Sequence, residues 1–100
     1  MLDAARRAVS FMAGRTQHDL VRDDLLAYAV QHAIQIVGEA AFQLSDAAKA
    51  ETPDLPWPQI IGMRHRLVHA YHNVDPEKVW KTTQEDLPMM VRVLERIVDS

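Results

Sequence analysis

The chain has 100 residues and no cysteine, with 48% hydrophobic and 25% charged residues, a composition that excludes a disordered protein and a disulfide or thiolate-metal framework. This length predicts one folded domain over residues 1–100, and no apolar run approaches the roughly 20 residues that cross a bilayer, so we expect a cytoplasmic protein without membrane contact. The formal net charge of −3 argues against a protein that coats nucleic acid non-specifically, and it confines any contact with RNA to one cleft.

The first half of the chain is predicted to form two helices. Apolar residues three or four apart run over Leu2–Met12, and Gly14 breaks this first helix. The helix has no N-cap, so we expect that it is truncated and that its natural start lies upstream of Met1. A long central helix follows over about Asp19–Leu44, where the apolar residues form one continuous stripe.

Prolines mark the helices in the second half. The segment Glu51–Pro56 is predicted to be a loop, and a proline in the first turn favours a third helix over about 58–71. Asp75-Pro76 is an N-cap followed by proline at the first helical position, which predicts a fourth helix. This helix should kink or restart at Pro88, which has no backbone N–H. The sequence therefore predicts an all-α protein, an up-and-down bundle of four or five helices.

One stretch of the third helix, Arg64–Tyr71, concentrates two arginines, two histidines and a tyrosine. No acidic residue occurs over Ile61–Val74, so the positive charge is local although the whole chain is acidic. A guanidinium binds phosphate bidentately, and an imidazole accepts or donates a proton near neutral pH. This combination of residues predicts phosphodiester chemistry.

The helical period separates these residues onto two faces. Arg64 and Tyr71 fall within the apolar stripe, where a guanidinium needs a carboxylate, a phosphate or an open cleft. The other face carries the histidines, His65, His69 and His72. On a regular helix, Arg64 and His69 point about 140° apart. They can share a site if the helix ends before His69, or if they meet across a two-fold axis between identical subunits; we expect an interface in which both occur.

The segment contains a spaced motif, which consists of Arg64, His65, His69 and Tyr71. Further characteristic segments are Ile36–Ala40, Leu55–Trp57, Ile61–Arg64, Val74-Asp75, Val79-Trp80 and Glu85–Pro88. Together they resemble the HepT-like toxins of the HEPN superfamily, which are helical RNases encoded beside a minimal nucleotidyltransferase antitoxin. Asparagine is the usual residue of that family where His65 stands.

The resemblance implies a homodimer, or a higher homo-oligomer, in which two motifs line a composite cleft. Family members cut RNA through its own 2′-hydroxyl without a metal or other cofactor. In this interpretation His69 is the general base or acid and Arg64 holds the scissile phosphate. His65 and Arg66 would support them. The resemblance also implies a partner, the cognate nucleotidyltransferase antitoxin, which would silence the toxin by adenylylating Tyr71.

Other interpretations of the same residues stay open. Arg64 could be a structural arginine that pairs with Glu39 on the central helix. His65, His69 and His72 have a spacing that can seat zinc or nickel, although no acidic or sulfur ligand lies nearby to complete such a site. A third alternative is a non-catalytic nucleotide-binding or oligomerisation module built on the same bundle.

Overall fold

The computed structural model describes the backbone of residues 1–69 and 75–99 and the side chains of residues 1–65 and 75–96. Within these ranges the chain is helical and has no β-strand, which confirms the predicted all-α class. The helices of this described part all fall short of the length and apolar character that a membrane span requires. The elements in chain order are α1 (Leu2–Met12), α2 (Gln17–Arg22), α3 (Asp24–Gln43), α4 (Asp46–Ala50), α5 (Trp57–His69), α6 (Pro76–Lys81), the π-helical turn η2 (Thr82–Asp86) and α7 (Leu87–Asp99).

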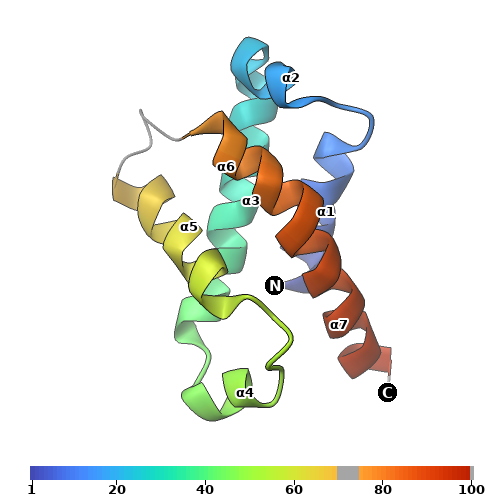
Figure 1. The fold of residues 1–100 in the computed structure, drawn as a ribbon, viewed down its shortest axis with the longest axis vertical. Coiled ribbons are helices and arrows are strands. Elements are labelled where there is room, and N and C mark those ends of the chain that lie inside the picture. The colour runs from blue at the N-terminus through green and yellow to red at the C-terminus, as the bar shows by residue number, and fades with distance from the viewer. Residues whose placement is uncertain (70–74, 100) are drawn as a thin grey trace.

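Four longer helices, α1, α3, α5 and α7, build the bundle, and successive ones run in opposite directions (Figure 1). α3 lies at the centre and packs against both α1 and α5, while α7 packs against α1. The short α2 contacts α6. The predicted up-and-down bundle is thus confirmed. The largest fully buried apolar side chains of its core are Met12, Ile34, Ile60, Leu87 and Met90.

Local start and stop signals place most helix ends where the sequence predicts them. α1 ends at Met12, and Gly14 just beyond it has a φ of +73°, which glycine adopts without steric cost. α5 begins at Trp57 with a proline as its second residue. Asp75 caps α6, because its carboxylate accepts a hydrogen bond of 2.9 Å from the backbone N–H of Glu77.

The central helix predicted over about Asp19–Leu44 is wrong in one respect, because it is interrupted at Asp23. This residue has an extended backbone, with φ −111° and ψ 96°, and its carboxylate accepts a hydrogen bond of 3.1 Å from the N–H of Leu26. A short carboxylate side chain competes for backbone N–H groups, so it favours a helix start over a helix interior. α2 therefore ends and α3 begins on either side of Asp23, and Leu20 and Leu26 are buried on the two sides of this break.

The last helix restarts at Pro88, as predicted. α6 passes into the π-helical turn η2, and α7 begins one residue before the proline. Proline has no N–H and its ring crowds the carbonyl of the preceding turn, so a regular α-helix cannot continue through it, and the wider turn absorbs the mismatch. The buried hydroxyls of Thr82 and Thr83 donate to backbone carbonyls of the preceding turn, at 2.9 and 2.7 Å.

α3 and α5 cross in close contact at Gly38. A Cβ atom at this position would overlap the Cβ of Arg64 and would lie 3.0 Å from its Cγ and 3.3 Å from its Cα. Glycine therefore lets the two helices approach, despite its cost of about 1 kcal/mol inside a helix. This close packing fixes the point at which α5 presents Arg64.

Replacing Gly38 by alanine should lower the free energy of unfolding by about 1–3 kcal/mol, because the new Cβ forces α5 away from α3. Urea denaturation measures this change. The matched control is Gly62→Ala on α5, where a Cβ meets no atom within 4 Å, and this variant should gain up to about 1 kcal/mol from its better helix propensity. A Gly38→Ala variant as stable as the wild type would contradict the assignment.

Candidate active site

Arg64 leaves α5 at the crossing with α3 and is half-buried. Its aliphatic stem lies against Gly38. The Nε atom is buried and has no hydrogen-bond partner in the described part of the chain. A buried N–H without an acceptor costs about 1–3 kcal/mol, and more when the group is charged. The guanidinium is therefore placed to gain from an oxygen acceptor that a ligand supplies.

The ring of Phe42 on α3 supports the guanidinium. The Arg64 Cζ atom lies 4.9 Å from the centroid of this ring, in a cation–π contact. The ring of His65 meets the same phenyl group edge-on, with centroids 5.9 Å apart and planes at 85°. Phe42 is 52% exposed, so the group stands at the surface. In the structure, two of the predicted site residues, Arg64 and His65, thus both contact the ring of Phe42.

Phe42 is the residue that the sequence prediction missed. It lies one helical turn after Gly38, so it faces the same neighbour as the glycine does. A glycine inside a long helix marks a close crossing, and an aromatic residue one turn later is placed to contact the helix that crosses there. This signal could have identified the contact once the crossing partner was known.

The structural pair of Arg64 with Glu39, one of the interpretations that the sequence leaves open, is not formed in the structure. Glu39 is exposed, and its carboxylate accepts a hydrogen bond of 3.3 Å from the side chain of Gln35. It follows Gly38 directly, so it points about 100° around α3 from the crossing and away from α5. The guanidinium consequently rests on an aromatic ring instead of a carboxylate.

The structure settles one question about His69. α5 stays helical through this residue, so the arrangement in which the helix ends before His69 is wrong. On a regular helix, positions 64 and 69 lie about 140° apart around the axis, and a meeting of the two residues across two subunits stays a prediction. The side chains of Arg66 and His69, and the residues Tyr71 and His72, lie outside the part that the structure describes.

Charge around Arg64 is unbalanced. The ion pairs found between described residues lie elsewhere, and they are Arg6–Glu95 at 2.9 Å, Arg15–Asp23 at 3.6 Å and Lys81–Glu85 at 4.0 Å. Because no described carboxylate pairs with Arg64, its charge is available to an anionic ligand. Within the same residues no group of three His, Asp or Glu side chains could hold a metal ion, and the histidine site predicted from His65, His69 and His72 falls mostly outside them.

A family model described as "Ribonuclease HepT-like" matches residues 1–97. The chain belongs to the HepT-like ribonuclease family. A protein of Thermococcus cleftensis named "Probable ribonuclease HepT" is 35% identical over 79 residues, which cover 79% of this chain and 72% of the relative. A protein of Methanocaldococcus jannaschii named as a putative RNase is 27% identical over 95 residues, covering 95% of this chain and 87% of the relative. No solved structure matches the chain.

Membership of this family confirms both the resemblance and the predicted enzyme class, a ribonuclease. The family match spans the crossing of α3 and α5. The half-buried Arg64 therefore belongs to a ribonuclease fold, and a cation without an acidic partner suits the phosphates of RNA.

A double-mutant cycle tests the contact between Arg64 and Phe42. Phe42→Leu removes the ring face and Arg64→Met removes the charge, so the two changes should show a coupling of about 0.5–1 kcal/mol in the free energy of urea unfolding. The matched cycle of Glu39→Gln with Arg64→Met should show a coupling below about 0.5 kcal/mol. Coupling to Glu39 with none to Phe42 would contradict the structure.

Proposed function

We propose that the protein cuts RNA by attack of a ribose 2′-hydroxyl on the adjacent phosphate, without a metal ion. The observation that carries this proposal is Arg64, a half-buried guanidinium with an unpartnered Nε and no acidic partner among described residues, in a ribonuclease family. A phosphate oxygen would satisfy Nε and compensate the charge at once. DNA has no 2′-hydroxyl, so it should not be cut.

The proposed step needs one base and one acid. The bond between the 2′-oxygen and phosphorus forms while the bond between phosphorus and the 5′-oxygen breaks. His69 takes the proton of the 2′-hydroxyl or gives one to the departing 5′-oxygen, because an imidazole can accept or donate a proton near neutral pH. Arg64 stabilises the negative charge that develops on the phosphate oxygens. His65 and Arg66 support RNA binding beside them.

The proposal places the active site between two copies of the chain. Leu25 and Tyr28 on the outer side of α3 are 81% and 72% exposed. A mainly apolar groove of about 450 Å³ runs between α1 and α3, and its lining includes Phe11 and Ile36. Protruding apolar side chains and an apolar groove on one surface complement each other across a two-fold axis, and such a surface is unfavourable in water. Phe42, which supports Arg64, lies on the same helix.

A homodimer would bring together the two predicted catalytic groups, which lie on different faces of one regular helix. The backbone of α5 is helical through His69, and two positions five residues apart on a regular helix lie about 140° apart around its axis. In the dimer, Arg64 of one protomer would act with the partner's His69. Residues 1–100 form one domain in this interpretation, and each domain supplies part of the cleft.

We further propose that the protein is the toxin of a toxin–antitoxin pair that acts on RNA in the cytoplasm. Its partner is a minimal nucleotidyltransferase that transfers AMP to Tyr71. Tyr71 is two residues from His69, so the added nucleotide would bring a negative phosphate to the cationic segment that binds RNA. The modification would then compete with the substrate for the same arginine.

Cleavage of a short RNA by purified protein tests the proposed chemistry. Arg64→Met, which keeps the stem that packs on Gly38, should lower the rate by about 100–1000-fold. His69→Gln should lower it by about 100–10,000-fold. The wild type should keep its activity in EDTA and leave a matched DNA intact.

The control is Arg92→Met, an exposed arginine on α7, which should cut at the wild-type rate. Thermal melting verifies that each variant is folded. Wild-type rates in both Arg64→Met and His69→Gln would contradict the mechanism. Loss of cleavage in EDTA with recovery on adding a divalent metal would contradict metal independence.

Sedimentation velocity tests the dimer. The wild type should sediment as a species of twice 11.4 kDa, and Tyr28→Glu should raise the dissociation constant at least tenfold, because it buries a charge in an apolar interface. Val21→Glu on α2 is the matched control, since Val21 is also exposed, at 60%, but lies off this face. A monomeric wild type at micromolar concentration, or equal effects of both variants, would contradict the interface.

A further inference from the structure

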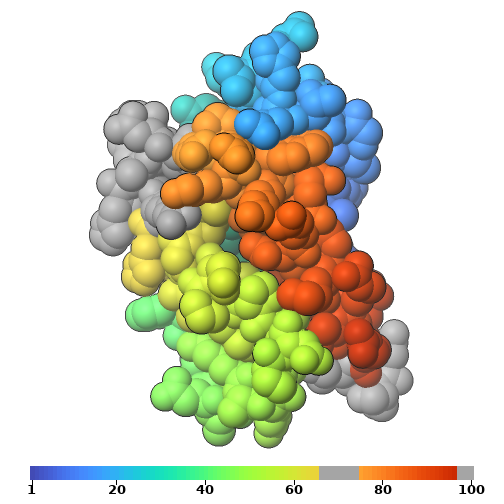
Figure 2. Space-filling model, viewed as in Figure 1, coloured from blue at the N-terminus to red at the C-terminus, as the bar shows by residue number. Residues whose placement is uncertain are grey.

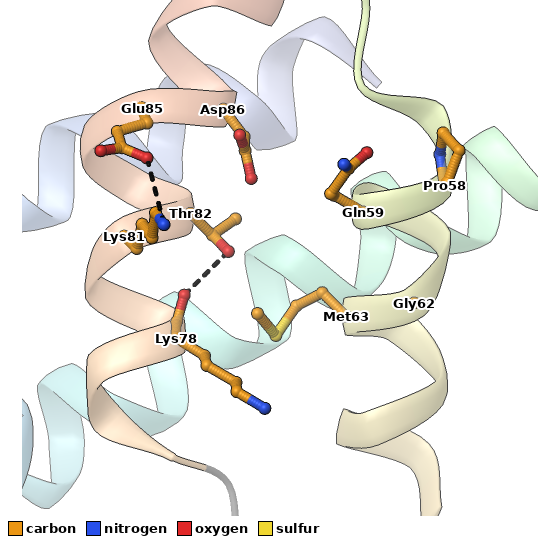
Figure 3. Close-up of a pocket in the computed structure, with 9 residues that line it drawn as sticks. All are labelled: Pro58, Gln59, Gly62, Met63, Lys78, Lys81, Thr82, Glu85 and Asp86. Atoms are coloured by element: carbon orange, nitrogen blue, oxygen red, sulfur yellow. Dashed lines mark hydrogen bonds and ion pairs between the residues drawn. The ribbon is translucent and has the colours of Figure 1, made fainter.

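A second concave site lies on the other side of α5. A pocket of about 560 Å³ separates the first half of α5 from α6 and η2 (Figure 3). Gly62 lies two residues before Arg64, so it faces about 160° away around the helix. The pocket is therefore separate from the Arg64 site. Its lining is Pro58, Gln59, Gly62, Met63, Lys78, Lys81, Thr82, Glu85 and Asp86.

Asp86 faces this pocket from the π-helical turn, opposite Gln59 of α5 (Figure 3). Its carboxylate is half-buried and makes no hydrogen bond or ion pair within the described residues. Burial raises the pKa of the Asp86 carboxyl above its ordinary value; the charge of Glu85 adds to this effect, and the charge of Lys81 partly opposes it. An ionised carboxylate in this position gains from hydrogen-bond donors that a ligand brings.

Two lysines stand at the side of the pocket formed by α6. Lys81 pairs with Glu85 at 4.0 Å. Lys78 forms no ion pair in the described part of the chain, and its side chain extends from α6 below Met63 in Figure 3. One cationic side chain is thus available for an anion at the α6 end of this wall, while the carboxylate of Asp86 lies toward its other end, on η2 (Figure 3).

The pocket chemistry selects among ligands. The lysines disfavour a cation, and the carboxylates of Glu85 and Asp86 disfavour a compact anion. A neutral ring with N–H donors on one edge can meet the Asp86 carboxylate, and a phosphate attached at its far end can meet Lys78. The thioether of Met63 offers an apolar surface to such a ring.

We propose that this pocket binds a guanine nucleotide. The N1–H and amino group of guanine lie side by side and can both donate to the Asp86 carboxylate, and the guanine O6 accepts from the Gln59 amide. The phosphate then lies near Lys78. Adenine has a bare acceptor where guanine has N1–H, so that acceptor would face the carboxylate, and the pocket discriminates against it.

The nucleotide has two possible sources, a base of bound RNA or a free mononucleotide. The chemistry is the same for both. The proposal concerns binding alone, so it can fail while the proposed cleavage holds, and it can hold while the cleavage fails.

Isothermal titration with guanosine 3′-monophosphate tests the pocket. The wild type should bind it at least tenfold more tightly than adenosine 3′-monophosphate, and Asp86→Asn should reduce this preference at least tenfold. Replacing a desolvated carboxylate by an amide relieves a buried charge, so Asp86→Asn should remain folded. Equal affinity of the wild type for the two nucleotides would overturn the proposal.

The Gly62→Leu variant tests whether blocking the pocket abolishes nucleotide binding without destabilising the fold. A Cβ at this position meets no atom within 4 Å, so the longer side chain should extend into the pocket and abolish guanosine 3′-monophosphate binding without lowering the melting temperature. Gly62→Ala, which adds one carbon, is the control and should keep most of the affinity. If Gly62→Leu binds the nucleotide as tightly as the wild type does, the nucleotide binds elsewhere and the proposal is contradicted.

A competition experiment then distinguishes the sources. If the pocket reads RNA, a short RNA with one guanine should displace guanosine 3′-monophosphate, and the same RNA with adenine there should displace it at least tenfold less well. If the pocket takes a free nucleotide, neither RNA should displace it. Displacement by both RNAs alike would contradict base recognition.

Discussion

The close approach of α3 and α5 at Gly38 is the constraint on which the rest of the molecule depends. It lets the stem of Arg64 lie directly on the central helix, and it brings the guanidinium above Phe42. A larger residue at the crossing would separate the helices and remove both contacts. The position of the candidate active site therefore follows from backbone packing at one glycine, and the chemistry is added by residues that the crossing brings together.

The setting of Arg64 suits an arginine better than a lysine. A guanidinium stays charged in a partly buried position, and its flat face stacks on an aromatic ring while its N–H groups remain directed outward. Nε, which has no partner among the described residues, carries a cost there, and a phosphate oxygen can remove that cost. An anionic ligand would thus gain binding free energy by relieving the unfavourable position that the packing of α5 on α3 gives to Nε.

The sequence predicted features that depend on local rules, and it failed where distant residues decide. The Asp75 cap and the restart at Pro88 follow from local backbone chemistry. The break at Asp23 was missed because the apolar period continues through it. The sequence left a pair of Arg64 with Glu39 open, because an opposite charge in the sequence does not show which way a helix is rotated at its crossing. Phe42 was missed for the same reason, since its role depends on which helix lies across Gly38.

α5 carries the two proposed sites on opposite faces, and this geometry limits how they can act together. Gly62 and Arg64 are two positions apart in the sequence, but they lie on opposite sides of the helix, whose diameter with side chains is about 10–12 Å. A single nucleotide is too short to reach around a helix of that width. A guanine held by Asp86 therefore cannot belong to the nucleotide whose phosphate Arg64 binds. If RNA occupies both sites, the pocket reads a neighbouring base, and the strand must pass around the end of α5 or cross from one protomer to the other.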